Sequence, residues 1–246
     1  MNTSRRIAVV AGVLFILATV ADLISRLVFV TPIVSDPVDL AKISANETQV
    51  LLGALLLFIG AVAAASIAIS LYPVLRKHSE ALALGSVLFR LIEGALYIGI
   101  VVCLLLLVTL SRDSANAGAA AASAYVVPSV LLMAARDSLG EVAVLVFGLG
   151  ALMYYWAFYQ TRLIPRWLSA LGLLAIASLM ASALLVMLRF IEPLSPPQVV
   201  LALPIAVQEM VLAVWLIAKG FNPSAIAAES AGRTSVPRAA ASGSAA

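Results

Sequence analysis

The sequence predicts an all-α fold, a polytopic membrane bundle of six transmembrane helices. Hydrophobic residues make up 63% of the 246 residues and charged residues only 11%, against about 45–50% and about 25% in ordinary globular proteins. The mean hydropathy is +1.12. So few charges cannot cover a water-soluble surface, and the bilayer is therefore the expected environment.

Six stretches are long enough to cross the hydrocarbon core of a bilayer, which takes about 20 mostly apolar residues. Each is bounded by charged residues or by Pro and Gly. The expected spans are Ile7–Val30, Val50–Leu75, Ala81–Leu110, Leu139–Tyr159, Trp167–Leu188 and Val199–Ala218.

The first span follows Arg5 and Arg6 and stays apolar as far as Val30. A cleaved secretory signal peptide is the alternative, because residues 18–21 offer a small-residue cleavage site. The apolar character continues beyond that site, which a cleaved segment does not need. The sequence therefore favours a retained span.

Basic turns separate most of the other spans. The second ends at Arg76 and Lys77, and the third begins a few residues later. Residues 162–166 carry an arginine at each end and separate the fourth span from the fifth. The sixth ends at Lys219. These short turns predict antiparallel neighbouring helices.

Two stretches fall outside the spans. Ala117–Ala135 contains Pro128 and too few apolar residues to cross a bilayer, so we expect it to lie on the surface or to re-enter. From Asn222 onward the chain is mostly Ala, Ser, Gly, Pro and Arg, which predicts a disordered cytoplasmic tail over 222–246. Residues 1–221 then form one transmembrane domain.

Positive charges predict the orientation, because basic loops stay in the cytoplasm. With both termini inside, nine Lys and Arg residues face the cytoplasm and four, Lys42, Arg112, Arg136 and Arg189, lie outside. This predicts a multi-pass protein with its N- and C-termini inside. Aromatic residues beside the turn at 162–166 are expected at the inner interface: they are Tyr154, Tyr155, Trp156, Phe158, Tyr159 and Trp167.

Ionisable residues inside the spans are the candidate site. Asp22 and Arg26 lie four residues apart on one helical face, and Arg90, Glu93 and Tyr97 form a second face over two turns. Such residues are costly in a bilayer and generally face the bundle interior. Glu141 opens the fourth span, and Gln208 and Glu209 lie in the middle of the sixth.

The balance of these charges distinguishes a site from simple ion pairs. Ion pairs that fasten the bundle remain one interpretation, but four carboxylates accompany only two arginines, Arg26 and Arg90, within the spans. An unpaired acid must be neutral or face water. We expect a polar funnel from the outer side to mid-membrane. Its catalytic candidates are Glu93, Glu209 and Asp22; its substrate-binding candidates are Arg90, Arg26, Tyr97, Gln208, Glu141 and Trp215.

Composition excludes several classes of function. A net charge of +3 without a basic patch gives no reason to expect nucleic-acid binding. One cysteine and one histidine exclude a disulfide scaffold and make zinc or haem ligation implausible, so no metal or cofactor is expected. No Walker-type phosphate loop, His-Glu-x-x-His motif or nucleophile elbow is present.

Several segments together resemble the bacterial domain-of-unknown-function family 4386. They include Asp22 in the first span, residues 46–48 at the entry to the second, the Arg90-x-x-Glu93 face, the turn 162–169 and the closing segment 215–221. The resemblance covers about residues 5–222. It implies a multi-pass protein of the bacterial inner membrane and carries no reaction or residue role.

These features of the sequence are compatible with three functions. The first is binding, with acid–base conversion such as cyclisation or isomerisation, of a hydrophobic small molecule or lipid. Here Glu93 and Glu209 would be the acids, and Arg90 would hold an anionic group or tune Glu93. The second is a proton-coupled transporter, for which a homo-oligomer would compensate for the short chain. The third is a non-catalytic module that binds another membrane protein.

Overall fold

The computed structural model describes residues 3–35, 37–117 and 122–227, whose regular structure is helical throughout. Six of the described helical segments are long and apolar enough to cross a membrane, which confirms the predicted all-α architecture. The elements are α1 (Thr3–Ile24), η1 (Ser25–Val30), α2 (Leu40–Ala45), α3 (Glu47–Leu75), α4 (Glu80–Ala117), η2 (Ala122–Tyr125), α5 (Val126–Thr161), α6 (Arg166–Met187) and α7 (Pro196–Ala218).

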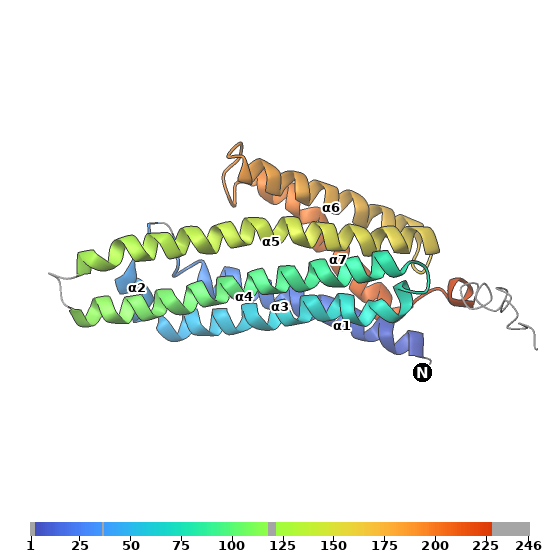
Figure 1. The fold of residues 1–246 in the computed structure, drawn as a ribbon, viewed down its shortest axis with the longest axis horizontal. Helices are drawn as coiled ribbons and strands as arrows, with labels where there is room; N and C mark the ends of the chain where they lie inside the picture. The colour runs from blue at the N-terminus through green and yellow to red at the C-terminus, as the bar shows by residue number, and fades with distance from the viewer. Residues whose placement is uncertain (1–2, 36, 118–121, 228–246) are drawn as a thin grey trace, which may run out of the picture.

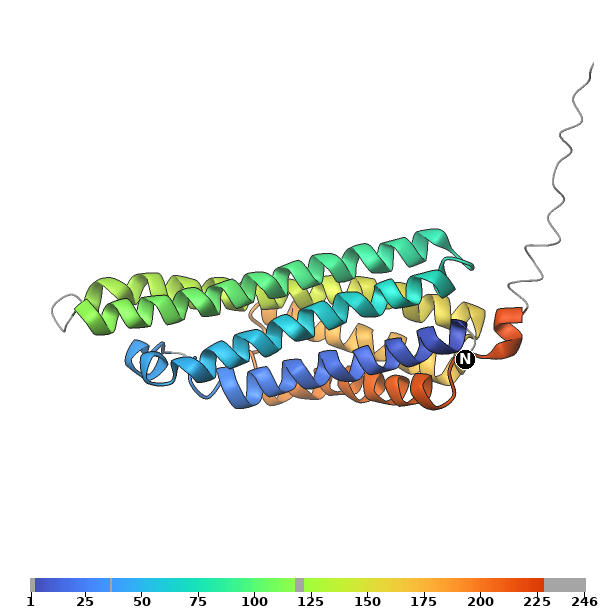
Figure 2. The ribbon, with the colours of Figure 1, turned by 90° about the horizontal axis from the view of Figure 1, so that it is seen from below.

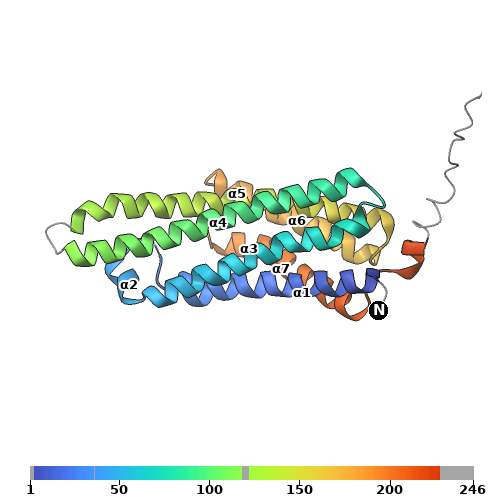
Figure 3. The ribbon, with the colours of Figure 1, turned by 60° about the horizontal axis from the view of Figure 1, so that its bottom comes forward.

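The long helices run side by side along the molecule (Figures 1 and 3), and their contacts close them into a ring. Each packs on the next one along the chain, α1 on α3, α3 on α4, α4 on α5, α5 on α6 and α6 on α7, and α7 packs back on α1. The N-terminus and the end of the described chain lie at the same end of the bundle (Figure 2). Because the ring closes, all six helices can contribute to one interior.

The apolar segments form helices because, in an apolar medium, every backbone N–H and C=O group needs a hydrogen bond, and a helix supplies these bonds within its own segment. Small residues then allow close contact between helices. A Cβ on Gly12 would lie 2.7 Å from the carbonyl oxygen of Ala213, and one on Gly172 would overlap the ring of Tyr155. The α1–α7 and α5–α6 contacts therefore depend on glycine.

Helices α4 and α5 are longer than the sequence predicts. They contain 38 and 36 residues, about 57 and 54 Å at 1.5 Å per residue, whereas the hydrocarbon core is only about 30 Å thick. The prediction of a surface-lying or re-entrant Ala117–Ala135 is therefore wrong for its described residues 117 and 122–135. Ala-rich sequence continues the helix, and Pro128 is tolerated in the first turn, where its missing N–H has no acceptor.

The extended parts of α4 and α5 form an outer tier, at the end away from the termini. Here they run beyond α6 and α7 and lie beside α2 (Figure 1). Glu47 at the start of α3 forms an ion pair with Arg112 of α4. A separate apolar cluster, which includes Ile43, Leu107 and Met133, fills the space between these elements.

The opposite end of the bundle holds the chain termini. Arg5 of α1 donates to the carbonyl oxygens of Leu216 and Ile217 at 3.0 and 2.5 Å, and so caps the last turn of α7. Residues 223–227, part of the predicted tail, form a helical turn. The remainder of that tail, 228–246, lies outside the described residues.

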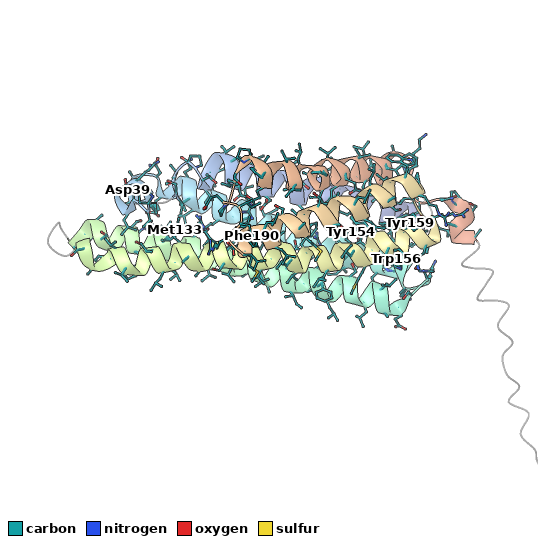
Figure 4. All side chains as sticks on the ribbon, turned by 90° about the horizontal axis from the view of Figure 1, so that it is seen from above. Asp39, Met133, Tyr154, Trp156, Tyr159 and Phe190 are labelled. Atoms are coloured by element: carbon teal, nitrogen blue, oxygen red, sulfur yellow. The ribbon has the colours of Figure 1, made fainter. Side chains whose placement is uncertain are left out.

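The expected aromatic belt divides into two groups. Trp156 and Trp167 are exposed, as expected at an interface, but the side chains of Tyr154, Tyr155 and Phe158 are completely buried, which corrects their predicted place. Figure 4 shows Trp156 and Tyr159 near one end of the molecule. Tyr154 and Tyr155 lie four and three residues before Phe158, so the three side chains share one face of α5. The helical periodicity sets which face a residue lies on, whatever its type.

Candidate functional site

A cavity of about 210 Å³ lies inside the ring, and every long helix contributes to its wall. Its α6 and α7 residues, such as Leu179 and Glu209, lie near the middle of those helices. The wall combines acids and a base with apolar groups. It is formed by Ala18, Thr19, Asp22, Leu23, Leu57, Gly60, Ala61, Ala64, Arg90, Glu93, Tyr97, Val144, Phe147, Leu179, Ile205, Ala206 and Glu209.

Arg90 is the base in this wall, and three contacts hold it. Its Nη1 lies 2.9 Å from Oε2 of Glu93. Its Nε donates to the carbonyl oxygen of Ala64 at 3.2 Å, and its guanidinium lies 4.8 Å from the ring centroid of Phe147. Only 2% of the residue is exposed. Arg90 thus ties α4 to α3 and α5 while presenting positive charge to the cavity.

Glu93 completes the pair but keeps bonding capacity. It lies one turn after Arg90 on α4 and is 4% exposed. Apart from the ion pair with Arg90, Oε2 has no hydrogen-bond partner among the described residues. A buried carboxylate oxygen with free acceptor capacity can accept a proton or a hydrogen bond from a guest molecule.

Glu209 of α7 forms no salt bridge with a described residue, although Arg90 in the same cavity wall attracts its charge. Its Oε1 accepts a long hydrogen bond, 3.4 Å, from the hydroxyl of Tyr154 on α5. Pro204 interrupts the backbone bonding of α7 one turn earlier, and Ser178 of α6 donates to the nearby Leu201 carbonyl at 2.8 Å. This bond joins α7 to α6 about two turns before Glu209.

Asp22, Arg26 and Tyr97 lie together toward the outer tier. The carboxylate of Asp22 accepts from Nε of Arg26 at 2.8 Å, and the guanidinium lies 5.7 Å from the ring centroid of Tyr97. Arg26 is in η1, a π-helical segment. Asp22 and Tyr97 line the cavity, and Arg26 holds both without being part of the wall.

The other three candidates lie elsewhere. Gln208 is buried on another face of α7, where it accepts from the hydroxyl of Tyr155 and donates to the Leu168 carbonyl at 3.1 Å. Glu141, near the middle of α5, lies 4.0 Å from the exposed Arg189, which follows the end of α6. Trp215 packs edge-to-face on Trp167 near the opposite end. Helical geometry explains why Gln208 lies outside the cavity that Glu209 lines. Adjacent residues point about 100° apart around a helix, so these two side chains face different directions.

Two parts of the site carry too little chemical signal to be found in the sequence. Small α3 residues, among them Gly60 and Ala64, leave the space that forms the cavity, although their pattern indicates only close helix packing. Phe147 and Tyr154 lie two turns apart on one face of α5, and that spacing is the one available signal. The described residues contain no group of three His, Cys, Asp or Glu that could hold a metal ion.

Fold and site together define a multi-pass helical membrane protein with a polar cavity at the centre of its bundle. A family model described as a domain of unknown function (DUF4386) matches residues 10–220, and the chain belongs to this family. This confirms the resemblance based on the turn 162–169 and the closing segment 215–221. Neither the curated proteins nor the solved structures contain a significant match to the chain.

Proposed function

We propose that the central cavity binds a small hydrophobic molecule or lipid fragment with one polar or anionic group, and that Glu209 exchanges a proton with it. The observation that carries the proposal is the environment of Glu209. This acid faces the same cavity as the Arg90–Glu93 pair, and it forms no salt bridge with a described residue, since the salt bridge of Arg90 is made with Glu93. An acid used only to fasten helices would be expected to have a partner.

The wall supplies two kinds of recognition. Arg90 offers positive charge to a carboxylate or phosphate, while Phe147, Leu179 and Ile205 offer apolar contact. In a cyclisation or isomerisation, the proton given by Glu209 to an alkene or epoxide is balanced by the proton released when a carbon–hydrogen bond breaks. Such a reaction needs no cofactor.

The test is the identity of what co-purifies with the protein in mild detergent. Extracts of wild type and Glu209→Gln are compared by mass spectrometry, with Glu141→Gln as the matched control because Glu141 is an acid outside the cavity. We expect a defined hydrophobic compound with wild type and the control, and its loss or chemical change with Glu209→Gln. Bulk phospholipid alone, equal in all three samples, would contradict ligand binding.

A second variant tests the cavity without altering charge. Ala206 of α7 is partly exposed within the wall, so Ala206→Leu should fill space while leaving every carboxylate in place. If the cavity holds the compound, this variant also loses it. Retention by a folded Ala206→Leu protein would place the compound elsewhere.

A proton path is the second candidate function, and the size of the cavity favours it. About 210 Å³ is below the roughly 300–1,000 Å³ typical of sites for drug-sized ligands, but it has room for several waters. Asp22, Glu93 and Glu209 from three helices border this space. Proton flux into liposomes that is lost in Glu209→Gln, with no co-purifying compound, would favour transport.

A further inference from the structure

A second pocket lies at the end of the bundle that carries the termini. It has a volume of about 390 Å³ and is bounded by the α5–α6 turn and by the segment that follows α7. It shares no residue with the central cavity. The proposed function uses neither the positive charge of this pocket nor its apolar floor.

Three cations surround this pocket without a matching acid. Arg162, Arg166 and Lys219 line it and are exposed. Neither the wall of the pocket nor the ion pairs of the described residues give any of them a carboxylate. Three like charges around one hollow repel each other, and an anion placed between them would offset this repulsion.

Backbone contacts fix the main-chain segments from which these cations project. Arg162 adopts a left-handed conformation, φ 55°, at the end of α5, and the N–H of Asn222 donates to the Leu163 carbonyl at 2.8 Å, tying the two rims together. Arg5 donates to three carbonyl oxygens at the end of α7. This interaction offsets the partial negative charge of the helix end, which would otherwise oppose an anion beside Lys219.

The floor of the pocket is apolar and aromatic. Leu163, Ile164 and Phe221 line it and are buried, and Trp215 adds an indole that packs edge-to-face on the exposed Trp167, 6.5 Å between ring centroids. Trp at the ends of membrane-spanning helices is typical of the interface between headgroups and acyl chains. A soluble anion would make no use of this apolar surface.

We propose that this pocket binds the phosphate group of an anionic phospholipid, with the three cations around the phosphate and the glycerol and first acyl carbons against Trp215. Basic pockets between transmembrane helices are suited to such headgroups. Free phosphate compounds share the anionic chemistry, and the experiment separates them from lipid.

Trp215 provides the readout, because the chain has only three tryptophans, and one of them, Trp215, lines the pocket while packing on a second, Trp167. Short-chain phosphatidylglycerol is titrated into the detergent-solubilised protein while tryptophan fluorescence is followed. Parallel titrations use phosphatidylcholine, which has no net charge, and inorganic phosphate or glycerol phosphate. We expect a saturable change with phosphatidylglycerol at concentrations where the other three give none.

Substitution of the cations should weaken this binding stepwise. At about 1 kcal/mol per cation near a lipid surface, each of Arg162→Asn, Arg166→Gln and Lys219→Gln should cost about fivefold in affinity, and the triple variant about a hundredfold. Asn is chosen at 162 because it tolerates the left-handed conformation. Arg166→Lys, which keeps the charge, should bind within about threefold of wild type.

The matched control is the double variant Arg76→Gln, Lys77→Gln. It removes two positive charges from a turn at the same end of the bundle but outside the pocket, and its affinity should stay within about twofold of wild type. Equal loss in the control and in the pocket variants would overturn the proposal, as would equal binding of phosphatidylcholine. Saturation by inorganic phosphate or glycerol phosphate would overturn the assignment to lipid.

Discussion

At the scale of single residues, the three acids of the central cavity have different electrostatic partners. Glu93 is buried against Arg90, Asp22 is half-exposed and bonded to Arg26, and Glu209 has a tyrosine hydroxyl as its hydrogen-bond partner. Helical spacing in the sequence predicts the pair of Asp22 with Arg26, but it leaves either Glu93 or Glu209 as the partner of Arg90. Only the approach of α7 to α5 shows that Glu209 meets Tyr154.

This difference predicts unequal effects on stability. Glu93→Gln leaves the guanidinium of Arg90 buried without its carboxylate, and breaking a buried ion pair costs about 3–5 kcal/mol. Glu209→Gln breaks no ion pair among the described residues and should change the free energy of unfolding by less than about 1 kcal/mol. Thermal unfolding in detergent measures both.

The double variant Arg90→Leu, Glu93→Leu is the control for this comparison. Removing both charges avoids the lone buried ion, so the double variant should be more stable than Glu93→Gln. Equal destabilisation by Glu93→Gln and Glu209→Gln would contradict the assigned pairing.

At the scale of helices, the α5–α6 contact depends on close approach at Gly172. Tyr155 is fully buried there, with its ring tilted by 50° against that of Tyr154 at 4.5 Å between centroids and its hydroxyl bonded to Gln208, so its ring has little freedom to move. The sequence shows a glycine and an aromatic run, but no local pattern says that they meet. The meeting is decided by the register of the two helices.

We therefore expect Gly172→Ala to destabilise the protein by about 1–3 kcal/mol, because the new methyl group overlaps the Tyr155 ring. Gly140→Ala in α5 is the matched control, since its methyl group would lie 3.9 Å from the nearest atom, Cδ1 of Ile100. That substitution should stabilise the helix by about 0.5–1 kcal/mol.

Both variants can be compared by the midpoint of thermal unfolding, with ring packing followed by the near-ultraviolet circular dichroism of tyrosine. A Gly172→Ala protein as stable as Gly140→Ala would mean that α5 and α6 are less closely packed than described.

At the scale of the whole molecule, the closed ring and the even number of spans put both ends of the described chain on one side of the bundle. The distribution of Lys and Arg predicts that this side is cytoplasmic. The outer tier of α4 and α5 would then project on the opposite side of the membrane, with Arg112 and Asp113 near its tip.

Cysteine labelling tests this orientation. The single native cysteine, Cys103, is buried, so a Cys103→Ala background is suitable for Lys77→Cys at the terminal end and Asp113→Cys in the outer tier. In intact cells, a membrane-impermeant maleimide should label the protein with Asp113→Cys, and it should label the protein with Lys77→Cys only after permeabilisation. The reverse pattern would invert the predicted topology.

Much of this organisation was determined by the sequence alone. The six spans follow from apolar length, and the placement of Asp22, Arg90, Glu93 and Glu209 in the bundle interior follows from the cost of charge in a bilayer. Both are local properties, because a helix satisfies its own backbone and its periodicity assigns its faces.

Tertiary structure decided the rest. Closure of the ring by α7 on α1 brings Glu209 to the cavity of Arg90 and Glu93, while Gln208 beside it joins Tyr155 outside that cavity. The cationic pocket likewise joins residues 162–166 to residues 215–223. Such meetings depend on helix register and crossing, which are set by side-chain packing between segments far apart in the chain, and no local pattern in the sequence encodes them.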